Sequence, residues 1–157
     1  MKTRLALVLF SVCIIAGCVP AFGETLYPVQ GPLAAQAPPP VMTATFHGTS
    51  SGKFTLVQAN GGSFQGKWVS VVPSFVNAKT PETPSSYLPQ PNLAFAWDVV
   101  YGQGYFLAHV LGTRIRQAIV TGDMGTVLQV ECQFTDGHSA FNGVAVDSKG
   151  NIYKVAW

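Results

Sequence analysis

Three cysteines carry the most reactive side chains of this chain, because a thiolate is a strong nucleophile and metal ligand. Cys13 lies inside an apolar run, Cys18 follows the end of that run, and Cys132 stands alone in the second half. Cys132 alternates with Val130 and Phe134, which places all three on one face of a strand. We therefore expect Cys132 to point inward as a small buried residue, and otherwise to pair with another molecule.

The remaining chemistry-bearing residues form no recognisable catalytic set. The three histidines lie far apart in sequence, at His47, His109 and His138. None belongs to an H-x-x-H or H-E-x-x-H motif, and His109 falls in an apolar stretch typical of a core histidine. A G-x-S-x-G elbow is missing, and the carboxylates are too sparse to nominate a glycosidase pair. The sequence predicts no catalytic residue, metal ligand or cofactor, and a hydrolase is only the third-ranked function.

Two arginines form the most distinctive charged pattern in the body of the chain. Arg114 and Arg116 flank Ile115, so on a strand they share one face. Alternating charges of this kind are typical of a solvated or edge-protecting face. Together with Tyr87, in a long Pro-rich loop, they are our candidate binding surface for an acidic group, such as a lipid phosphate or a peptidoglycan carboxylate.

The first residues have the organisation of an export signal. Lys2 and Arg4 form a short positive region, and an almost unbroken apolar run extends from Leu5 to Ile15. As a helix this run is about 16 Å long, whereas a bilayer core is about 30 Å thick. The run is therefore too short to span a membrane comfortably.

Ile15-Ala16-Gly17-Cys18 resembles the lipobox of bacterial lipoproteins, an aliphatic residue followed by two small ones and a cysteine. The resemblance covers residues 1–18 and implies cleavage between Gly17 and Cys18 and acylation of Cys18, with chains such as palmitate. Two or more chains would hold the protein on a membrane without a transmembrane helix. In a Gram-negative envelope, Val19 favours the outer membrane. The alternative is an ordinary secretory signal cut near Ala21 or Gly23, with Cys18 lost.

Charge argues against a nucleic-acid partner. The whole chain has 9 basic and 7 acidic residues, a formal net charge of +2. Loss of Lys2 and Arg4 leaves seven of each, and the mature chain is then formally neutral. The remaining charges form no polybasic run, so the expected partners are the membrane, through the lipid on Cys18, and an envelope protein or glycan.

Proline-rich stretches divide the chain. We expect a signal peptide over 1–17, a lipid-anchored Pro-rich tether over 18–40 and one β domain over 41–157. The prolines of 18–40 interrupt any periodicity, although its aliphatic and aromatic residues suggest that part of it packs on the domain. A second Pro-rich stretch, 72–92, is predicted to be a long loop and the most favourable place for a binding surface.

The domain itself is predicted to be all-β: a small antiparallel sandwich or barrel built from meander hairpins, without an amphipathic helix. Turn-forming dipeptides such as Asn60-Gly61 separate short alternating runs. The expected strands lie at 42–46, 53–58, 63–70, 93–97, 105–111, 114–120, 126–134, 140–146 and 151–157. The expected aromatic core residues are Phe54, Phe64, Trp68, Trp97, Phe106, Phe134 and Tyr153.

These features favour a membrane-anchored envelope lipoprotein with a non-enzymatic structural or binding role. The alternative is a ligand-binding β-barrel that carries an apolar or envelope-derived molecule in a cavity lined by Phe106, Val130 and Phe134. A filled interior would argue against that carrier.

Overall fold

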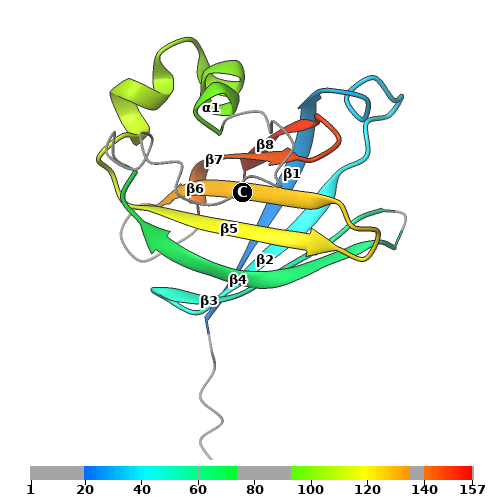
Figure 1. Cartoon of the computed structure of the whole chain (residues 1–157), viewed down its shortest axis with the longest axis horizontal. Helices are drawn as coiled ribbons and strands as arrows, with labels where there is room; N and C mark the ends of the chain where they lie inside the picture. Colours follow the sequence, from blue (N-terminus) through cyan, green and yellow to red (C-terminus); the bar gives the residue numbers. More distant parts are fainter. Residues whose placement is uncertain (1–19, 60, 74–92, 135–139, 157) are drawn as a thin grey trace, which may run out of the picture.

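A computed structural model describes residues 20–59, 61–73, 93–134 and 140–156 of the chain. Its main body is a closed antiparallel barrel in which strands adjacent in sequence are also adjacent in space (Figure 1). The strands are β1 (Ala21–Gln30), β2 (Met42–His47), β3 (Ser51–Val57), β4 (Ser63–Val71), β5 (Ile115–Gly122), β6 (Val127–Phe134), β7 (Ala140–Asp147) and β8 (Ile152–Ala156). The predicted all-β meander is confirmed, and of the two expected architectures the chain adopts the barrel.

Closure joins the first strand to the last. β1 pairs antiparallel with β2 on one side and with β8 on the other, for example through Leu26 opposite Val155. We call the end of the barrel at which β1 begins the near end. The turns β1–β2, β3–β4, β5–β6 and β7–β8 lie at the opposite, far end. Closure leaves the sheet without an unpaired edge strand.

Alternation of apolar and polar residues explains most of the strands. In β3, Phe54 and Leu56 are fully buried, whereas the intervening Lys53 is exposed. A strand whose side chains alternate in this way buries one face against the barrel interior. The seven strands predicted between 42 and 70 and from 114 onward therefore agree with β2 to β8 to within a few residues.

The N-terminal stretch departs from the prediction. Residues 21–30, expected to belong to the tether, form β1, and Leu26 is completely buried. The barrel therefore begins at Ala21 rather than at residue 41. Pro28 is accommodated because the register between β1 and β8 shifts between Pro28 and Gln30, where a strand can tolerate a missing donor.

The stretch after the Pro-rich loop also departs from the prediction, because two expected strands are helical. Leu93–Tyr101 is helix α1, and Phe106–Val110 is a π-helical turn, η1. Leu93, Ala96 and Trp97 are buried at the i, i+3, i+4 spacing of a helix face, which outweighs the β propensity of the sequence. None of the helices in the described ranges is long and apolar enough to span a membrane.

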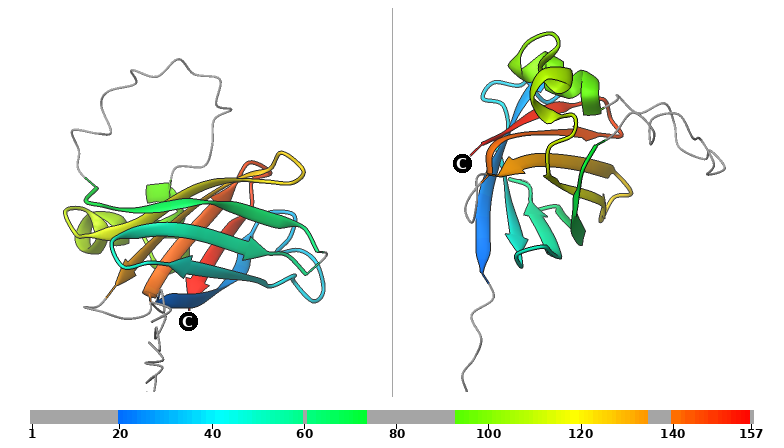
Figure 2. Two further views of the ribbon diagram at one scale, coloured as in Figure 1. Left: turned by 90° about the horizontal axis from the view of Figure 1, so that it is seen from below. Right: turned by 90° about the vertical axis from the view of Figure 1, so that its left-hand side faces the viewer.

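The helices cover one side of the barrel only. α1 packs against β7 and β8, and a second core beneath it includes Val144, Val146 and Ile152. Figure 2 shows β2 and β3 on the opposite side of the barrel from the helices. Of the predicted aromatic core residues, Phe106 and Phe134 are partly buried, and the other five are buried.

Candidate functional site

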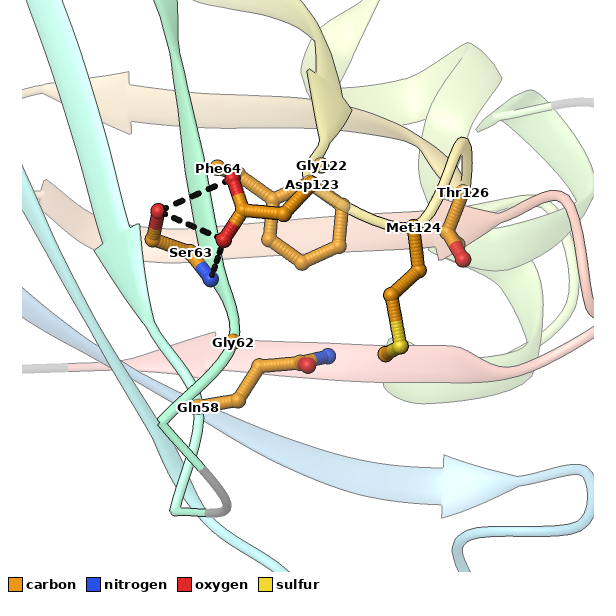
Figure 3. A pocket seen from close by; sticks show the side chains of 8 residues that line it. All are labelled: Gln58, Gly62, Ser63, Phe64, Gly122, Asp123, Met124 and Thr126. Carbon is orange, nitrogen blue, oxygen red and sulfur yellow. Dashed lines mark hydrogen bonds between the residues drawn. The ribbon is translucent and has the colours of Figure 1, made fainter.

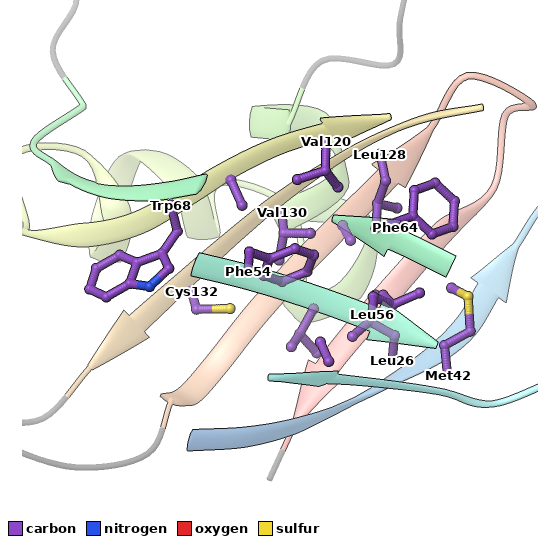
Figure 4. Close-up of a cluster of buried hydrophobic side chains, with 14 of the residues drawn as sticks. Leu26, Met42, Phe54, Leu56, Phe64, Trp68, Val120, Leu128, Val130 and Cys132 are labelled. Carbon is purple, nitrogen blue, oxygen red and sulfur yellow. The ribbon is translucent and has the colours of Figure 1, made fainter. Parts of the chain in front are cut away.

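The barrel interior is filled by side chains (Figure 4). Large residues such as Phe54, Phe64 and Trp68 are buried, and each has a glycine as its register partner on a neighbouring strand. Gly66 shows how close this packing is, because a Cβ there would lie 2.5 Å from Cγ1 of Val120. At Gly143 a Cβ would lie 2.8 Å from Sγ of Cys132 and 2.9 Å from Cβ of Val155. These contacts join register partners on neighbouring strands, and one cluster of buried side chains contributed by all eight strands occupies the interior, as in a packed core.

Arg116 is the main departure from this apolar interior. It lies in β5, is 8% exposed, and is therefore buried rather than on the outer face predicted for it. Its guanidinium carbon lies 3.5 Å from the ring centroid of Phe134, 4.6 Å from that of Trp68 and 4.9 Å from that of Phe22. Burial lowers the pKa of Arg116, and Cys132 and Glu24 act against that shift. Nη1 of Arg116 has no hydrogen-bond partner within the described ranges.

Cys132 is fully buried and points inward, as predicted. Burial raises the pKa of its thiol well above the ordinary value, Glu24 raises it further, and Arg116 acts in the opposite direction. A thiol held in its neutral form is a poor nucleophile. Cys132 therefore acts as a packing residue, and the buried side chains of Glu24 and Arg116 act on its thiol electrostatically.

A second buried carboxyl group lies on the outside of the barrel under the helices. Oε2 of Glu131 accepts a hydrogen bond from Nε1 of Trp97 at 2.9 Å, and Oε1 accepts one from Nε2 of Gln117 at 3.0 Å. Burial raises the pKa of Glu131, whereas the two donors lower it. Trp97 also stacks with Tyr105 at a centroid distance of 5.9 Å. These contacts fix α1 to β6 and, through Glu131, to β5, and no sequence pattern predicted them.

Aspartate side chains accept hydrogen bonds at the far end of the barrel, and Figure 3 shows those of Asp123. Asp123 accepts hydrogen bonds from the backbone N of Ser63 at 2.9 Å and from its Oγ at 3.0 Å. The hollow beside this contact measures about 10 Å³, which is room for one water molecule and no larger ligand. Asp147, in the next turn, accepts from Asn151 Nδ2 at 2.8 Å and from Tyr153 Oη at 2.7 Å. Asp123 lies in the β5–β6 turn, and Asp147 ends β7 where the β7–β8 turn begins.

An open groove of about 740 Å³ lies on the outer face of β3 and β4. Lys53, Gln65, Lys67 and Val69 line it, with the backbone of Gly52 and Gly66. Lys53 and Lys67 are direct register partners across the two strands. We take this groove as the candidate functional site. No sequence pattern identified it, because its lining depends on the register of β3 against β4.

The predicted site residues are not brought together there. Gly17, Cys18 and Tyr87 lie outside the described residues. Arg114 is exposed just before β5, whereas Arg116 lies inside the barrel, so the two do not form one surface.

The histidine predictions had mixed outcomes. His109 is exposed in η1 with its ring 4.7 Å from that of Tyr105, so the prediction of a core histidine is wrong. His47 is the last residue of β2, and His138 lies outside the described residues. In the part of the chain that the structure describes, no three His, Cys, Asp or Glu side chains gather as metal ligands would.

Comparison with protein families, with curated protein sequences and with solved structures returned no match to this chain.

Proposed function

We propose that this protein is a lipid-anchored, non-enzymatic envelope protein whose barrel is a packed platform that binds through its outer surface. The observation that carries the proposal is the filled interior, in which Gly66 and Gly143 face neighbours too close for even a methyl group. A barrel packed in this way offers ligands its outside, where the groove over β3 and β4 lies.

The position of β1 supports lipidation at Cys18 over the ordinary secretory cleavage. A cut after Gly23 would remove Ala21, Phe22 and Gly23, which pair with His47, Phe46 and Thr45 of β2. It would also remove the Phe22 ring from the guanidinium of Arg116. Cleavage before Cys18 leaves the whole of β1 in the mature chain.

Metabolic labelling with a palmitate analogue tests the anchor. We expect the intact mass of the wild-type protein to show a chain that begins at Cys18 and carries acyl groups, and Cys18→Ser to lose both the label and the membrane association. Cys132→Ser is the matched control, because its thiol is buried in the barrel and should not affect labelling. An unlabelled wild-type protein, or a mature N-terminus beyond residue 18, would overturn the proposal.

The carrier remains the second candidate, because a closed barrel with a buried arginine near one end is a suitable fold for an anionic apolar ligand. Titration of the native protein with a fluorescent fatty acid distinguishes the packed platform from the carrier. The packed interior predicts no saturable binding. Saturable, stoichiometric binding that Arg116→Met abolishes would instead establish the carrier.

A further inference from the structure

A row of polar and basic side chains crosses the outer face of the barrel close to the start of β1. Ala21 is the register partner of His47, and Lys53 is the register partner of Lys67. Continuing the β2–β3 register from Phe46 and Phe54 places His47 beside Lys53. We call His47, Lys53 and Lys67 the basic row. Because neighbouring strands lie about 4.8 Å apart, the row ends roughly 14 Å from Ala21.

The charged side chains on the β2–β4 side of the barrel are all basic. Residues 42–71 contain Lys53 and Lys67 and not a single Asp or Glu. Two like charges directly opposite each other on a sheet are destabilising, so an anion that bridges them would relieve the repulsion. The pair also lines the open groove over β3 and β4.

Exposed aliphatic residues accompany the lysines. Val69 lies two residues beyond Lys67 and is 47% exposed. Ile119, which the β4–β5 register places beside Lys67, is 56% exposed. Lysine ammonium groups next to exposed aliphatic side chains are the composition that binds an anionic membrane surface.

The anchor would hold this face near the bilayer. Three peptide steps separate Cys18 from Ala21, and at about 3.6 Å each they span at most roughly 11 Å. The exit point is fixed next to the β2–β3 turn, because the backbone N of Gly48 donates to the carbonyl of Pro20 at 2.9 Å. The helices lie on the other side of the barrel and do not come between this face and the membrane (Figure 2).

From this geometry we infer that the basic row and its aliphatic neighbours lie on the membrane that holds the lipid, with Lys53 and Lys67 binding phospholipid phosphate. The inference rests on the proposed acylation of Cys18. It adds an orientation: the β2–β4 side of the barrel faces the lipid headgroups, and the helical side faces away.

The test uses the purified acylated protein in vesicles of phosphatidylcholine, alone or mixed with phosphatidylglycerol. A fluorophore is attached to Gln65→Cys, on the outer face of β4, or to Leu107→Cys, which is 59% exposed on the helical side. A quencher is carried on the lipid headgroups. We expect several-fold stronger quenching at position 65 than at position 107 in the anionic vesicles. Equal quenching, or stronger quenching at position 107, would overturn the orientation.

Charge variants test the phosphate contact. We expect Lys53→Gln combined with Lys67→Gln to reduce quenching at position 65 in anionic vesicles to its level in phosphatidylcholine. Lys149→Gln, in a far-end turn, is the matched control and should change nothing. Lys67→Glu separates binding from folding. The new carboxylate should pair with Lys53 and raise the melting temperature. It should nevertheless abolish the extra quenching that position 65 shows in anionic vesicles. Quenching that survives these substitutions would refute the lysine contact.

Two further readouts identify which proposal fails. Intact mass is measured on the same preparation, so a protein without acyl chains refutes the anchor. An acylated protein that shows the wrong orientation refutes only the inference made here. Inorganic phosphate is added as a competitor at constant ionic strength. We expect this addition to leave the quenching at position 65 unchanged. Competition by free phosphate at that constant ionic strength would indicate a soluble ligand instead of a lipid surface.

Discussion

The guanidinium carbon of Arg116 lies 3.5 Å from the centre of the Phe134 ring, inside the near end of the barrel. Trp68 and Phe22 complete an aromatic enclosure around it, and the Glu24 carboxyl group supplies opposite charge. Stacking against aromatic faces suits a planar, weakly hydrated guanidinium better than an ammonium group. A full positive charge is thereby accommodated in a core that is otherwise apolar.

Replacing Arg116 with Met is expected to lower the free energy of unfolding by about 3 kcal/mol, because it leaves the charge of Glu24 buried without its counter-charge. Urea denaturation measures this change. Arg114→Met is the matched control, since Arg114 is exposed and should change stability by less than about 0.5 kcal/mol. Equal effects of the two substitutions would contradict the buried pair.

Gly66→Ala is expected to destabilise the barrel by roughly 2 kcal/mol, because the added methyl group would lie 2.5 Å from Val120. Gly23→Ala, where a Cβ meets nothing within 4 Å, should be neutral or slightly stabilising. In a Val120→Ala background the cost of Gly66→Ala should largely disappear, since the clashing group is gone. A Gly66→Ala protein as stable as Gly23→Ala would mean that the interior contains unfilled space.

Alkaline pH is expected to destabilise the protein in part through Tyr101. Burial raises the pKa of its hydroxyl from 10.0 to about 12, although the backbone hydrogen bond with Gly143 lowers it. The contribution of Tyr101 to stability is therefore complete below about pH 10 and is lost as the pH rises through 12. Tyr101→Phe should flatten the fall in melting temperature between these values. The exposed Tyr27→Phe is the control, and an unchanged slope in Tyr101→Phe would refute the assignment.

The two turn aspartates at the far end should differ in their contribution to stability. Asp147 is 4% exposed and accepts four hydrogen bonds, two of them from the backbone of Lys149 and Asn151. Asp147→Ala should cost about 3 kcal/mol, because these donors would be left buried. Asp123 is exposed, so Asp123→Ala should cost only about 1 kcal/mol in the same denaturation assay. A larger effect at Asp123 would contradict this order.

Predictions from the sequence succeeded where one strand and its turn contain the whole signal. The alternation of Val130, Cys132 and Phe134 identified β6 and the inward direction of Cys132. β1 was missed because prolines obscure its alternation, and its pairing with β8 lies more than a hundred residues away. The helical segment was missed because five of the nine residues of α1 are aromatic or valine, and the i, i+3, i+4 spacing of Leu93, Ala96 and Trp97 becomes decisive only against β7 and β8.

The groove over β3 and β4 was harder to predict, because its lining depends on which residues of the two strands lie opposite each other. A two-residue turn at 60–61 would place Lys53 opposite Trp68. The turn closes instead between Gln58 and Gly62, with the N–H of Gln58 donating to the carbonyl of Gly62 at 2.8 Å, and Lys53 faces Lys67. Arg116 was misplaced for a similar reason: its aromatic enclosure comes from β1, β4 and β6, which no local pattern could bring together.

The hydrogen bonds between β1 and β8 would tie the timing of assembly to the proposed export. A lipoprotein precursor that emerges with its first residues leading would present Cys18 to the acylating enzymes long before Ile152–Ala156 arrive to meet Leu26 and its neighbours. Until those residues arrive, the barrel is open and the backbone amides of β1 that face β8 lack their hydrogen-bond partners. Under the proposed acylation, loss of these last few residues would leave an open sheet fixed to the membrane, a species prone to pair edge to edge with other copies.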